Sequence, residues 1–479
     1  MALKVTLVFT PNQLNPNFRE LVFRDESIGS IPPLSLLYVA ALLEQEKVQV
    51  ELIDMAAEQL TYPQALDRLR AFSPDLLGFT TTTPSFHPVL RWIKQFKKDT
   101  GLPILVGGEH IKLYPEESMV HPEIDFCIVG EAEIPLPQFI RAFKQGGKFQ
   151  GIKSLGYREN GRVVIDKTRQ AIKDIDTVPF PARHLIKNEL YENILTRKKN
   201  FTAFISTRGC PFKCAFCNQN LQAYRTRSPQ NFIEEVVRNY QEFKIRDFDI
   251  YDSTFTANKK LVLRVCEELQ RQNLDIGFSA RSRVDVVSKD MLDALKAAGC
   301  HTIMYGIESS NPEILKRMNK GISIARVIEV VEYTKKIGID ILGFFMFGFP
   351  GETHQTARET IRFALKLPLD YAQFTVLLPV TETAIYDYYR ERGLEDYWGE
   401  YTKDPAKERL IELIDTEIDR AEASGLVAEA YRRFFFRPRI IWKRFKKLQS
   451  LHEFQRLAKG ALGILANSLM ARDKDVTTH

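Results

Sequence analysis

Three cysteines lie close together in the middle of the chain, at Cys210, Cys214 and Cys217, with the spacing C-x3-C-x2-C. Thiolates of this kind bind zinc, copper(I) or iron-sulfur clusters. A zinc site would normally take ligands from a second nearby pair of Cys or His, and no such pair follows. A cluster held by three cysteines leaves one iron open to a small molecule. The loop is therefore predicted to hold an iron-sulfur cluster, with zinc or a chance grouping as the alternative.

The sequence around the cysteines supports a specific kind of cluster. An apolar run at 201–205 is a predicted strand, and Phe216 lies between the second and third cysteine. The stretch 206–219, STRGCPFKCAFCNQ, resembles the radical S-adenosylmethionine (SAM) superfamily. The resemblance implies a 4Fe-4S cluster on Cys210, Cys214 and Cys217, with SAM chelated at the open iron, Phe216 close to the cofactor, and reductive cleavage of SAM to a 5'-deoxyadenosyl radical.

Composition places these motifs in an ordinary globular protein. The chain has 479 residues, long enough for two or three domains, with 44% apolar and 27% charged residues and a net charge of +6. Cys127, Cys266 and Cys300 lie in apolar segments and are predicted to be buried thiols, which indicates a reducing cytoplasm. The short apolar run at the start is predicted to be a strand, not a signal peptide. No apolar stretch reaches the roughly 18 residues that a membrane span needs.

Residues 1–150 alternate strand and helix patterns. Apolar runs at 3–9, 48–53, 76–80, 104–106 and 126–129 predict parallel strands of a doubly wound, Rossmann-like α/β domain. Ligands bind such sheets beyond the carboxyl ends of the strands. Small and polar residues follow those ends and form the predicted binding set: Thr81, Thr82, Gly107, Gly108, Glu109, Gly130 and Glu131.

Three segments of this domain resemble cobalamin-binding domains that precede radical SAM domains: PPLSLLYVAALLE (32–44), VGGEHIKLYPEE (106–117) and DFCIVGEAE (125–133). The resemblance implies that cobalamin is bound by the residues named above. The D-x-H-x-x-G motif that supplies histidine to cobalt elsewhere is absent from 11–17. Cobalamin is therefore expected without a histidine ligand, and neither His87 nor His110 is predicted to replace it.

Residues 151–200 are predicted to be a bridge, with a hairpin of strands 154–157 and 162–165 followed by a proline-rich linker at 174–181. A second alternation runs from 201 to 380, with strands predicted at 201–207, 248–252, 277–280, 302–307, 342–347 and 373–378. This pattern resembles the partial (βα)6 barrel of radical SAM enzymes, which carries its chemistry at the carboxyl ends of the strands.

Those strand ends supply the predicted SAM contacts. YDSTFT, at the second strand, resembles a family segment near the SAM amino group and contributes Asp252, with Ser253 in place of a second acid. Arg281, in a segment similar to TRVD, is expected either to pair with the SAM carboxylate or to form a structural salt bridge. Glu308, in GIES, is expected to bind the ribose hydroxyls. The apolar strand before GFPGE (348–352) is similar to the region that packs on adenine.

Residues 381–479 are predicted to be a helical C-terminal region. The stretch 431–447 is dense in cations and aromatic residues and contains no acid. It is predicted to be a cap on the barrel, with peripheral contact to an anionic membrane as the alternative and nucleic acid as a weaker one.

The combined motifs resemble cobalamin-binding radical SAM proteins, a group that includes class B methylases and anaerobic magnesium-protoporphyrin monomethyl ester cyclases. The resemblance implies a C-methyltransferase acting on an unactivated carbon of a small-molecule, lipid or tetrapyrrole substrate, with an electron donor such as flavodoxin or ferredoxin. An oxidative cyclase of the same class is the alternative. A methylthiotransferase would need more cysteines in the first domain, and a non-catalytic cobalamin or SAM sensor would not need the intact cysteine motif.

Overall fold

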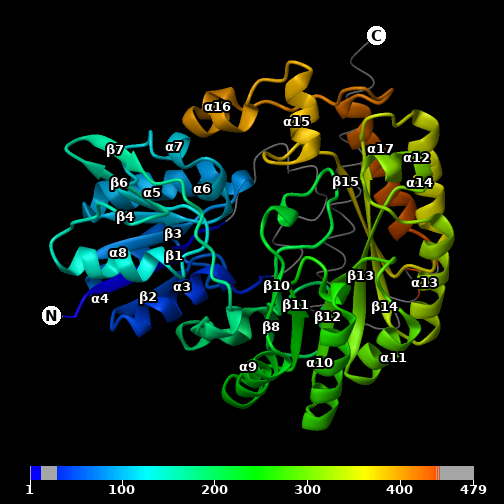
Figure 1. Cartoon of the computed structure of the whole chain (residues 1–479), viewed down its shortest axis with the longest axis horizontal. Helices are drawn as coiled ribbons and strands as arrows, with labels where there is room; N and C mark the ends of the chain where they lie inside the picture. Colours follow the sequence, from blue (N-terminus) through cyan, green and yellow to red (C-terminus); the bar gives the residue numbers. More distant parts are fainter. Residues whose placement is uncertain (1, 12–29, 439, 441, 443–479) are drawn as a thin grey trace. The chain divides into compact units, whose positions relative to one another are not determined.

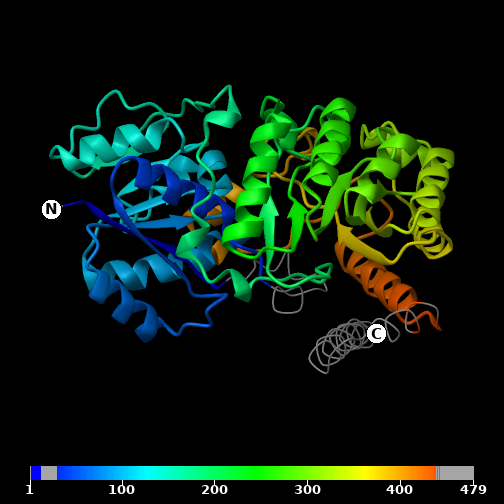
Figure 2. The same ribbon diagram turned by 90° about the horizontal axis from the view of Figure 1, so that it is seen from below.

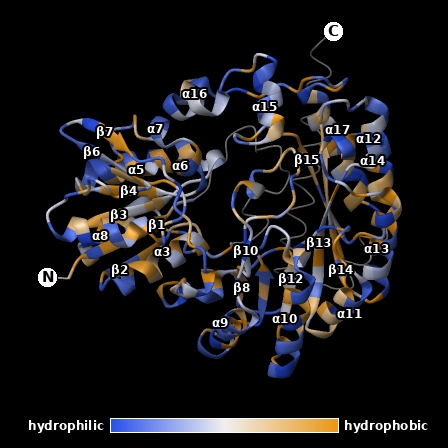
Figure 3. Ribbon diagram, viewed as in Figure 1, coloured by the Kyte–Doolittle hydropathy of each residue, from blue (hydrophilic) through white to orange (hydrophobic). Residues whose placement is uncertain are grey.

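The computed structural model describes residues 2–11, 30–438, 440 and 442. The described chain divides into two compact units. The first comprises 2–11, 30–191 and 394–409, and the second comprises 192–393 and the described residues from 410 onward. In both units the apolar residues concentrate in the strands, whereas the helices carry polar residues on one side (Figure 3).

The first unit is built on a seven-stranded sheet with the order β2-β1-β3-β4-β5-β6-β7 (Figure 1). The first five strands are parallel and the last two are antiparallel. Their bounds are β1 (Lys4–Phe9), β2 (Gln49–Asp54), β3 (Leu76–Thr80), β4 (Ile104–Gly107), β5 (Phe126–Ile128), β6 (Leu155–Glu159) and β7 (Arg162–Ile165). The five predicted strands of a doubly wound α/β domain are confirmed.

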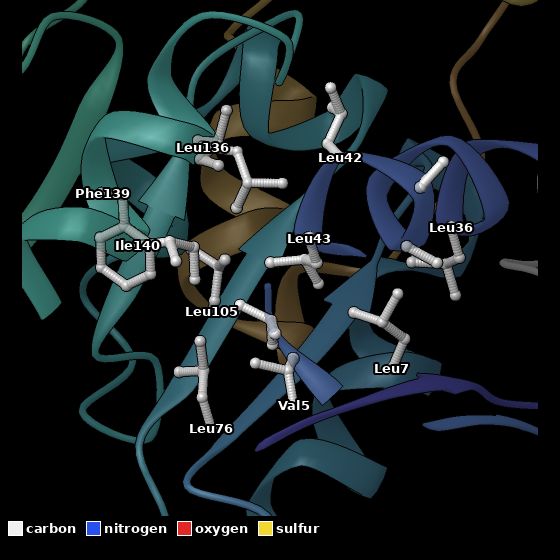
Figure 4. Packing of buried hydrophobic residues seen from close by; sticks show 14 of the residues in the cluster. Val5, Leu7, Leu36, Leu42, Leu43, Leu76, Leu105, Leu136, Phe139 and Ile140 are labelled. Carbon is white, nitrogen blue, oxygen red and sulfur yellow. The ribbon is translucent and has the colours of Figure 1, made fainter. Parts of the chain in front are cut away.

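Helices cover both faces of this sheet. On one face α3 (Leu34–Gln45) and α8 (Pro135–Lys144) bury Leu36, Leu43 and Phe139 against β-strand residues (Figure 4). On the other face α4 (Tyr62–Phe72) and α5 (Phe86–Thr100) bury a second cluster that includes Leu69 and Ile93. The two short helices α6 (Glu109–Leu113) and α7 (Pro115–Ser118) follow β4. Burial of each helix's apolar stripe fixes the layered order of the unit.

The boundaries of the first unit differ from the predicted division at 150. The hairpin of β6 and β7 pairs with β5 and extends the sheet, because β5 would otherwise be an unpaired edge. The unit continues to residue 191 and also includes 394–409, which the sequence placed in the C-terminal region. The short helix α16 (Tyr397–Lys403) lies in this returning segment and packs beside α7.

The second unit contains a six-stranded, entirely parallel sheet with the order β15-β14-β13-β12-β11-β8. Figure 2 shows its strands from below, in green to yellow. Strands follow one another in space as they do in sequence, which is the connectivity of a partial barrel. Their bounds are β8 (Phe201–Phe204), β11 (Asp247–Ile250), β12 (Gly277–Ser282), β13 (Cys300–Glu308), β14 (Asp340–Phe347) and β15 (Tyr371–Val376). The connecting helices are α9 (Pro229–Glu242), α10 (Lys259–Gln272), α11 (Lys289–Ala297), α12 (Pro312–Arg317), α13 (Ile324–Lys336) and α14 (His354–Lys366). The predicted (βα)6 arrangement is confirmed.

Two further helices complete the described second unit, α15 (Ala384–Glu391) and α17 (Arg420–Phe435). Helix α17 packs against β15, where the backbone N–H of Phe374 donates to the hydroxyl of Tyr431 at 3.2 Å. Residues 439, 441 and 443–447 of the basic stretch 431–447 lie outside the described residues. Among the residues that the structure describes, no helix is long and apolar enough to cross a bilayer.

Candidate functional site

The cysteine loop begins directly after β8 and is fixed there by Asp252. This carboxylate is 1% exposed and accepts hydrogen bonds from the backbone N–H groups of Ser206 at 2.8 Å and Thr207 at 3.0 Å, and from the Ser206 hydroxyl. Burial raises the pKa of Asp252, an effect that these donors oppose. Because the charge is buried with its donors, it fixes the direction in which the chain leaves the strand.

The rest of the loop is held at three points. Gly209 has φ +75°, and a β-carbon there would lie 2.6 Å from the carbonyl oxygen of Gln222, so only glycine fits this crossing. The backbone of Ala215 donates to Met318 O and accepts from Ile385 N, both at 2.9 Å. The Asn319 amide donates to the carbonyl of Lys213 at 2.6 Å. These contacts make the loop a rigid support for its side chains.

The three thiols of this loop, Cys210, Cys214 and Cys217, are free and half-buried. Burial raises the pKa of Cys217. In the described part of the chain, no three His, Cys, Asp or Glu side chains are arranged to hold a single metal ion. Thiolates of a four-iron cluster each bind a different iron and need not converge on one point. Three thiols on one loop match the cysteine ligands that such a cluster takes.

Two cations that the sequence did not single out lie beside the loop. Arg283 Nη1 donates to the sulfur of Cys214 at 3.2 Å, and its guanidinium lies 4.2 Å from the ring centre of Phe212. Lys320 Nζ lies 5.7 Å from the ring centre of Phe216. Arg283 belongs to the same TRVD-like segment as Arg281, so its residue type and its place after the strand are visible in the sequence.

The predicted SAM contacts lie at the carboxyl ends of three neighbouring strands, and two of them are already paired. Arg281 pairs with Asp249 at 2.8 Å, which is the structural salt bridge given above as the alternative. Glu308 pairs with Lys320 at 2.8 Å, and both side chains are less than a tenth exposed. Ser253 lies with its hydroxyl 3.4 Å from Gln219 Oε1, near the end of the cysteine loop. Contact of any of these residues with SAM stays a prediction.

Glu308 has an unusual backbone, with φ +66° in the left-handed region. The register between β13 and β14 shifts between Gly306 and Glu308, which turns the glutamate at the strand end. A β-carbon on Gly306 would lie 2.6 Å from Glu308 Oε1 and 2.7 Å from Lys320 Nζ. Left-handed backbone at a non-glycine residue is held only when surrounding contacts demand it, and here the Lys320 ion pair supplies one.

Glu352, the last residue of GFPGE, is a further buried acid that the sequence did not single out. Its side chain is fully buried, accepts a short hydrogen bond from Gly348 N, and has a second oxygen without a partner among the described residues. Burial raises the pKa of Glu352 to about 7. Its carbonyl accepts from Thr416 Oγ1 and Glu417 N, at 2.9 and 3.0 Å. Glu352 thus ties the end of β14 to the segment before α17.

In the first unit, the structure brings together the residues after β3 and β4. Thr81 donates its backbone N–H to Gly107 O at 2.9 Å and accepts from His110 N at 3.2 Å. Gly108 has φ +104°, and a β-carbon there would lie 2.4 Å from Thr81 O. The Thr82 hydroxyl lies 2.8 Å from that of Ser85. The two loops form one tightly bonded edge with small side chains, which fits close approach by a large flat ligand.

The acidic members of the same predicted set are engaged within the unit. Glu109 pairs with Lys112 at 2.9 Å, and Glu131 accepts from the backbone N–H of Ile172 at 3.2 Å. Gly130 has φ +100°. Their roles at a cofactor stay predictions.

His87 and His110 are buried and bonded to the returning segment 394–409. His87 Nε2 donates to the carbonyl of Tyr401, and His110 Nε2 lies 3.2 Å from the Thr402 hydroxyl. A third histidine, His121, donates to the carbonyl of Thr402 at 2.7 Å. Burial lowers the pKa of His87 to about 4 and that of His110 to about 3, so these rings are neutral at neutral pH. They hold α16 in place and are not exposed on a ligand-facing loop.

Comparison with known proteins finds a family model that matches in each of the two units. Residues 204–364 match the model of the radical SAM superfamily, and residues 21–140 match that of the B12 binding domain. An uncharacterized methyltransferase of Pyrococcus horikoshii is 34% identical over 419 residues, which cover 86% of this chain and 89% of the relative. The anaerobic magnesium-protoporphyrin IX monomethyl ester cyclase of Rubrivivax gelatinosus is 26% identical over 438 residues, covering 88% and 77%.

Among solved structures, the radical SAM methyltransferase TsrM from Kitasatospora setae, with cobalamin and a 4Fe-4S cluster bound, superposes with a TM-score of 0.65. It is 19% identical and the match covers 82% of this chain and 75% of that one, so the likeness supports the fold. The order of the two matched domains, together with the close relative that matches across both, shows that the chain belongs to the radical SAM superfamily, in the family whose members carry a B12 binding domain ahead of the radical SAM domain.

Proposed function

We propose that this protein is a cobalamin-dependent radical SAM methyltransferase that methylates an unactivated carbon of a small molecule. The observation that carries the proposal is the rigid loop with Cys210, Cys214 and Cys217 at the carboxyl end of the first barrel strand, in a chain that also has a B12 binding domain. The name of the relative that is 34% identical, a methyltransferase, supports the reaction type.

The cofactors supply the chemistry: bound at the cluster, SAM is the source of a radical that removes hydrogen, and bound cobalamin carries the methyl group. The protein's own residues bind and orient. The three cysteines hold the cluster, Asp252 fixes the start of their loop, and the strand-end loops around Gly108 and Gly130 of the first unit offer a close approach to the corrin.

The net reaction requires electrons from outside. One SAM gives S-adenosylhomocysteine and its methyl group, whereas a second SAM takes up the substrate hydrogen and gives 5'-deoxyadenosine and methionine. The balance requires two electrons for each methylated product, which a low-potential one-electron donor such as flavodoxin or ferredoxin would supply.

Anaerobic reconstitution of the full chain tests the radical assignment. We expect about four irons per chain and release of 5'-deoxyadenosine from SAM in the presence of dithionite. Cys217→Ala should lose this release, whereas Cys266→Ala, which changes a buried cysteine of α10 outside the loop, should keep both iron and release. Release of 5'-deoxyadenosine that is unchanged in Cys217→Ala would refute the assignment.

Hydroxocobalamin added during purification tests the first unit. A corrin absorbance that co-elutes with the wild-type protein supports the proposal. A protein that elutes without corrin absorbance would refute cobalamin binding.

Oxidative cyclisation is the second candidate, because a cyclase relative matches 88% of this chain. The two reactions differ in a measurable product. With a turned-over substrate, methyl transfer gives S-adenosylhomocysteine together with 5'-deoxyadenosine, whereas an oxidation gives 5'-deoxyadenosine without it. A methylthiotransferase is disfavoured because the first 150 residues contain a single cysteine, Cys127, which is fully buried.

A further inference from the structure

The guanidinium of Arg283 is fixed on several sides so that one nitrogen points at the cysteine loop. Its Nε and Nη2 donate to the two oxygens of Asp285 at 3.0 and 2.8 Å, a two-pronged pair. Nη2 also donates to the carbonyl of Lys320. The ring of Phe212 stacks on the guanidinium face, 4.2 Å away. These contacts leave Nη1 directed at Cys214 Sγ, 3.2 Å away.

Two of the three cysteines, Cys210 and Cys214, have different surroundings. Cys214 accepts from a guanidinium whose side chain is 7% exposed. Cys210, in contrast, lies 3.7 Å from the neutral hydroxyl of Thr254. A sulfur atom is a weak acceptor as a thiol and a stronger one as an iron-bound thiolate. The charged donor at Cys214 therefore gains strength when that sulfur carries negative charge.

From these contacts we infer that Arg283 is a positioning residue that sets the reduction potential of the cluster through Cys214. The inference rests on the proposed function, since it needs the cluster. One-electron reduction adds one negative charge, which spreads onto the cysteine sulfurs. A fixed positive donor stabilises the reduced cluster more than the oxidised one, and so raises the potential. The electron comes from the low-potential donor named above, or from dithionite in the assay.

The ion pair of Arg283 with Asp285 allows a test in which two substitutions shift the reduction potential in opposite directions. Asp285 lies on the far side of the guanidinium and partly neutralises it. Removal of the arginine charge should lower the potential, whereas removal of the aspartate charge should raise it. A purely structural role for the ion pair would make both changes act in the same direction.

The experiment is an anaerobic redox titration of the reconstituted full chain without SAM, followed by the electron paramagnetic resonance signal of the reduced cluster. Four proteins are compared at equal iron content per chain: wild type, Arg283→Gln, Arg283→Lys and Asp285→Asn. We expect Arg283→Gln to reduce the ratio of reduced to oxidised cluster at the wild-type midpoint by roughly tenfold, about 59 mV. Arg283→Lys should restore part of this loss, and Asp285→Asn should shift the midpoint upward.

Arg283→Gln leaves Asp285 without its partner, so the double variant Arg283→Gln with Asp285→Asn is measured too. It lacks both charges and should titrate below the wild type. Full iron content with an unchanged midpoint in the double variant would overturn the inference while leaving the proposed function intact. A wild-type chain that binds no cluster would refute the proposed function and this inference with it.

Discussion

The buried pair of Glu308 and Lys320 provides a quantitative test of how the barrel mouth is built. The two groups are 2.8 Å apart, with side chains 9% and 6% exposed. Removal of one partner of a buried pair leaves an uncompensated charge, at a cost of about 3–5 kcal/mol. Glu308 also sits at φ +66°, a conformation that costs about 1–3 kcal/mol and is held by its surroundings. Lys320→Met should therefore destabilise the second unit by at least about 3 kcal/mol.

The assay is urea unfolding of the apoprotein under reducing conditions, followed by circular dichroism. Lys320→Met is compared with Glu308→Gln and with the double variant, in which no unpaired charge remains. The double variant should recover most of the loss, because replacement of both members of a buried pair is often close to neutral. The matched control is Lys259→Met, which breaks an exposed pair with Asp290 and should change stability little.

A loss below about 1 kcal/mol in Lys320→Met would refute the reasoning, since it would mean that water solvates the Glu308 carboxylate once its partner is gone. A double variant as unstable as Lys320→Met would refute it differently, by showing that packing of the lysine stem matters and not its charge.

Two further predictions concern the first unit. Burial lowers the pKa of His110 from 6.5 to about 3. As the pH falls below 6.5, the unfolded chain therefore binds a proton at this residue that the folded chain does not bind. The free energy of unfolding should drop by about 2 kcal/mol between pH 7.5 and 5 for this residue alone. His87, whose pKa burial lowers to about 4, acts in the same direction. The melting temperature should depend less steeply on pH in His110→Gln than in the wild type. An equally steep dependence in this variant would contradict the prediction. Gly108→Ala places a β-carbon 2.4 Å from Thr81 O at φ +104° and should lower the free energy of unfolding in urea by about 1–3 kcal/mol. Gly101→Ala is the control, because Gly101 has φ +67° but open space around it, so only backbone strain acts there. Equal losses in both variants would show that the clash with Thr81 O does not contribute.

Much of the fold was readable from the sequence because its signals are local. Short apolar runs alternating with amphipathic stretches predict parallel strands and their helices, and each predicted strand of the two sheets is present within a few residues. The cysteine motif was equally local. Its three thiols lie within eight residues, from Cys210 to Cys217, and need no knowledge of the fold to be recognised.

The residues around the cysteines were harder to predict because their contacts are long-range. Arg283 meets Cys214 across 69 positions of the sequence. The choice between Arg281 and Arg283 depends on register and strand end, since Arg281 lies within β12 beside Asp249 while Arg283 lies just beyond the strand. Lys320 reaches Glu308 because of the irregular register at the end of β13, which no pattern of residue types encodes.

The return of 394–409 to the first unit was missed for a related reason. Its helix α16 spans only seven residues, and a short helix has no strong periodic signal. Hydrogen bonds from the first unit's histidines hold this helix in place. The last carbonyls of a helix lack partners within it, and here the carbonyls of Tyr401 and Thr402 accept from His87 and His121. Neither segment predicts this contact by itself: one holds three histidines within 87–121, and the other is the aromatic run YWGEY at 397–401.

The pairing of charges at the barrel mouth limits which groups can still serve a ligand. A carboxylate offers about four acceptor sites, and Asp252 uses three of them for Ser206 and Thr207. It is therefore better suited to hold the cysteine loop than to accept from the SAM ammonium group. Among the described residues, Glu308 uses one oxygen for Lys320, and Arg281 uses one of its five donors for Asp249. The predicted contacts therefore differ in how many hydrogen-bonding groups they have left. Asp252 is suited to position the predicted cluster ligands, whereas Glu308 and Arg281 have groups that a ribose and a carboxylate would require.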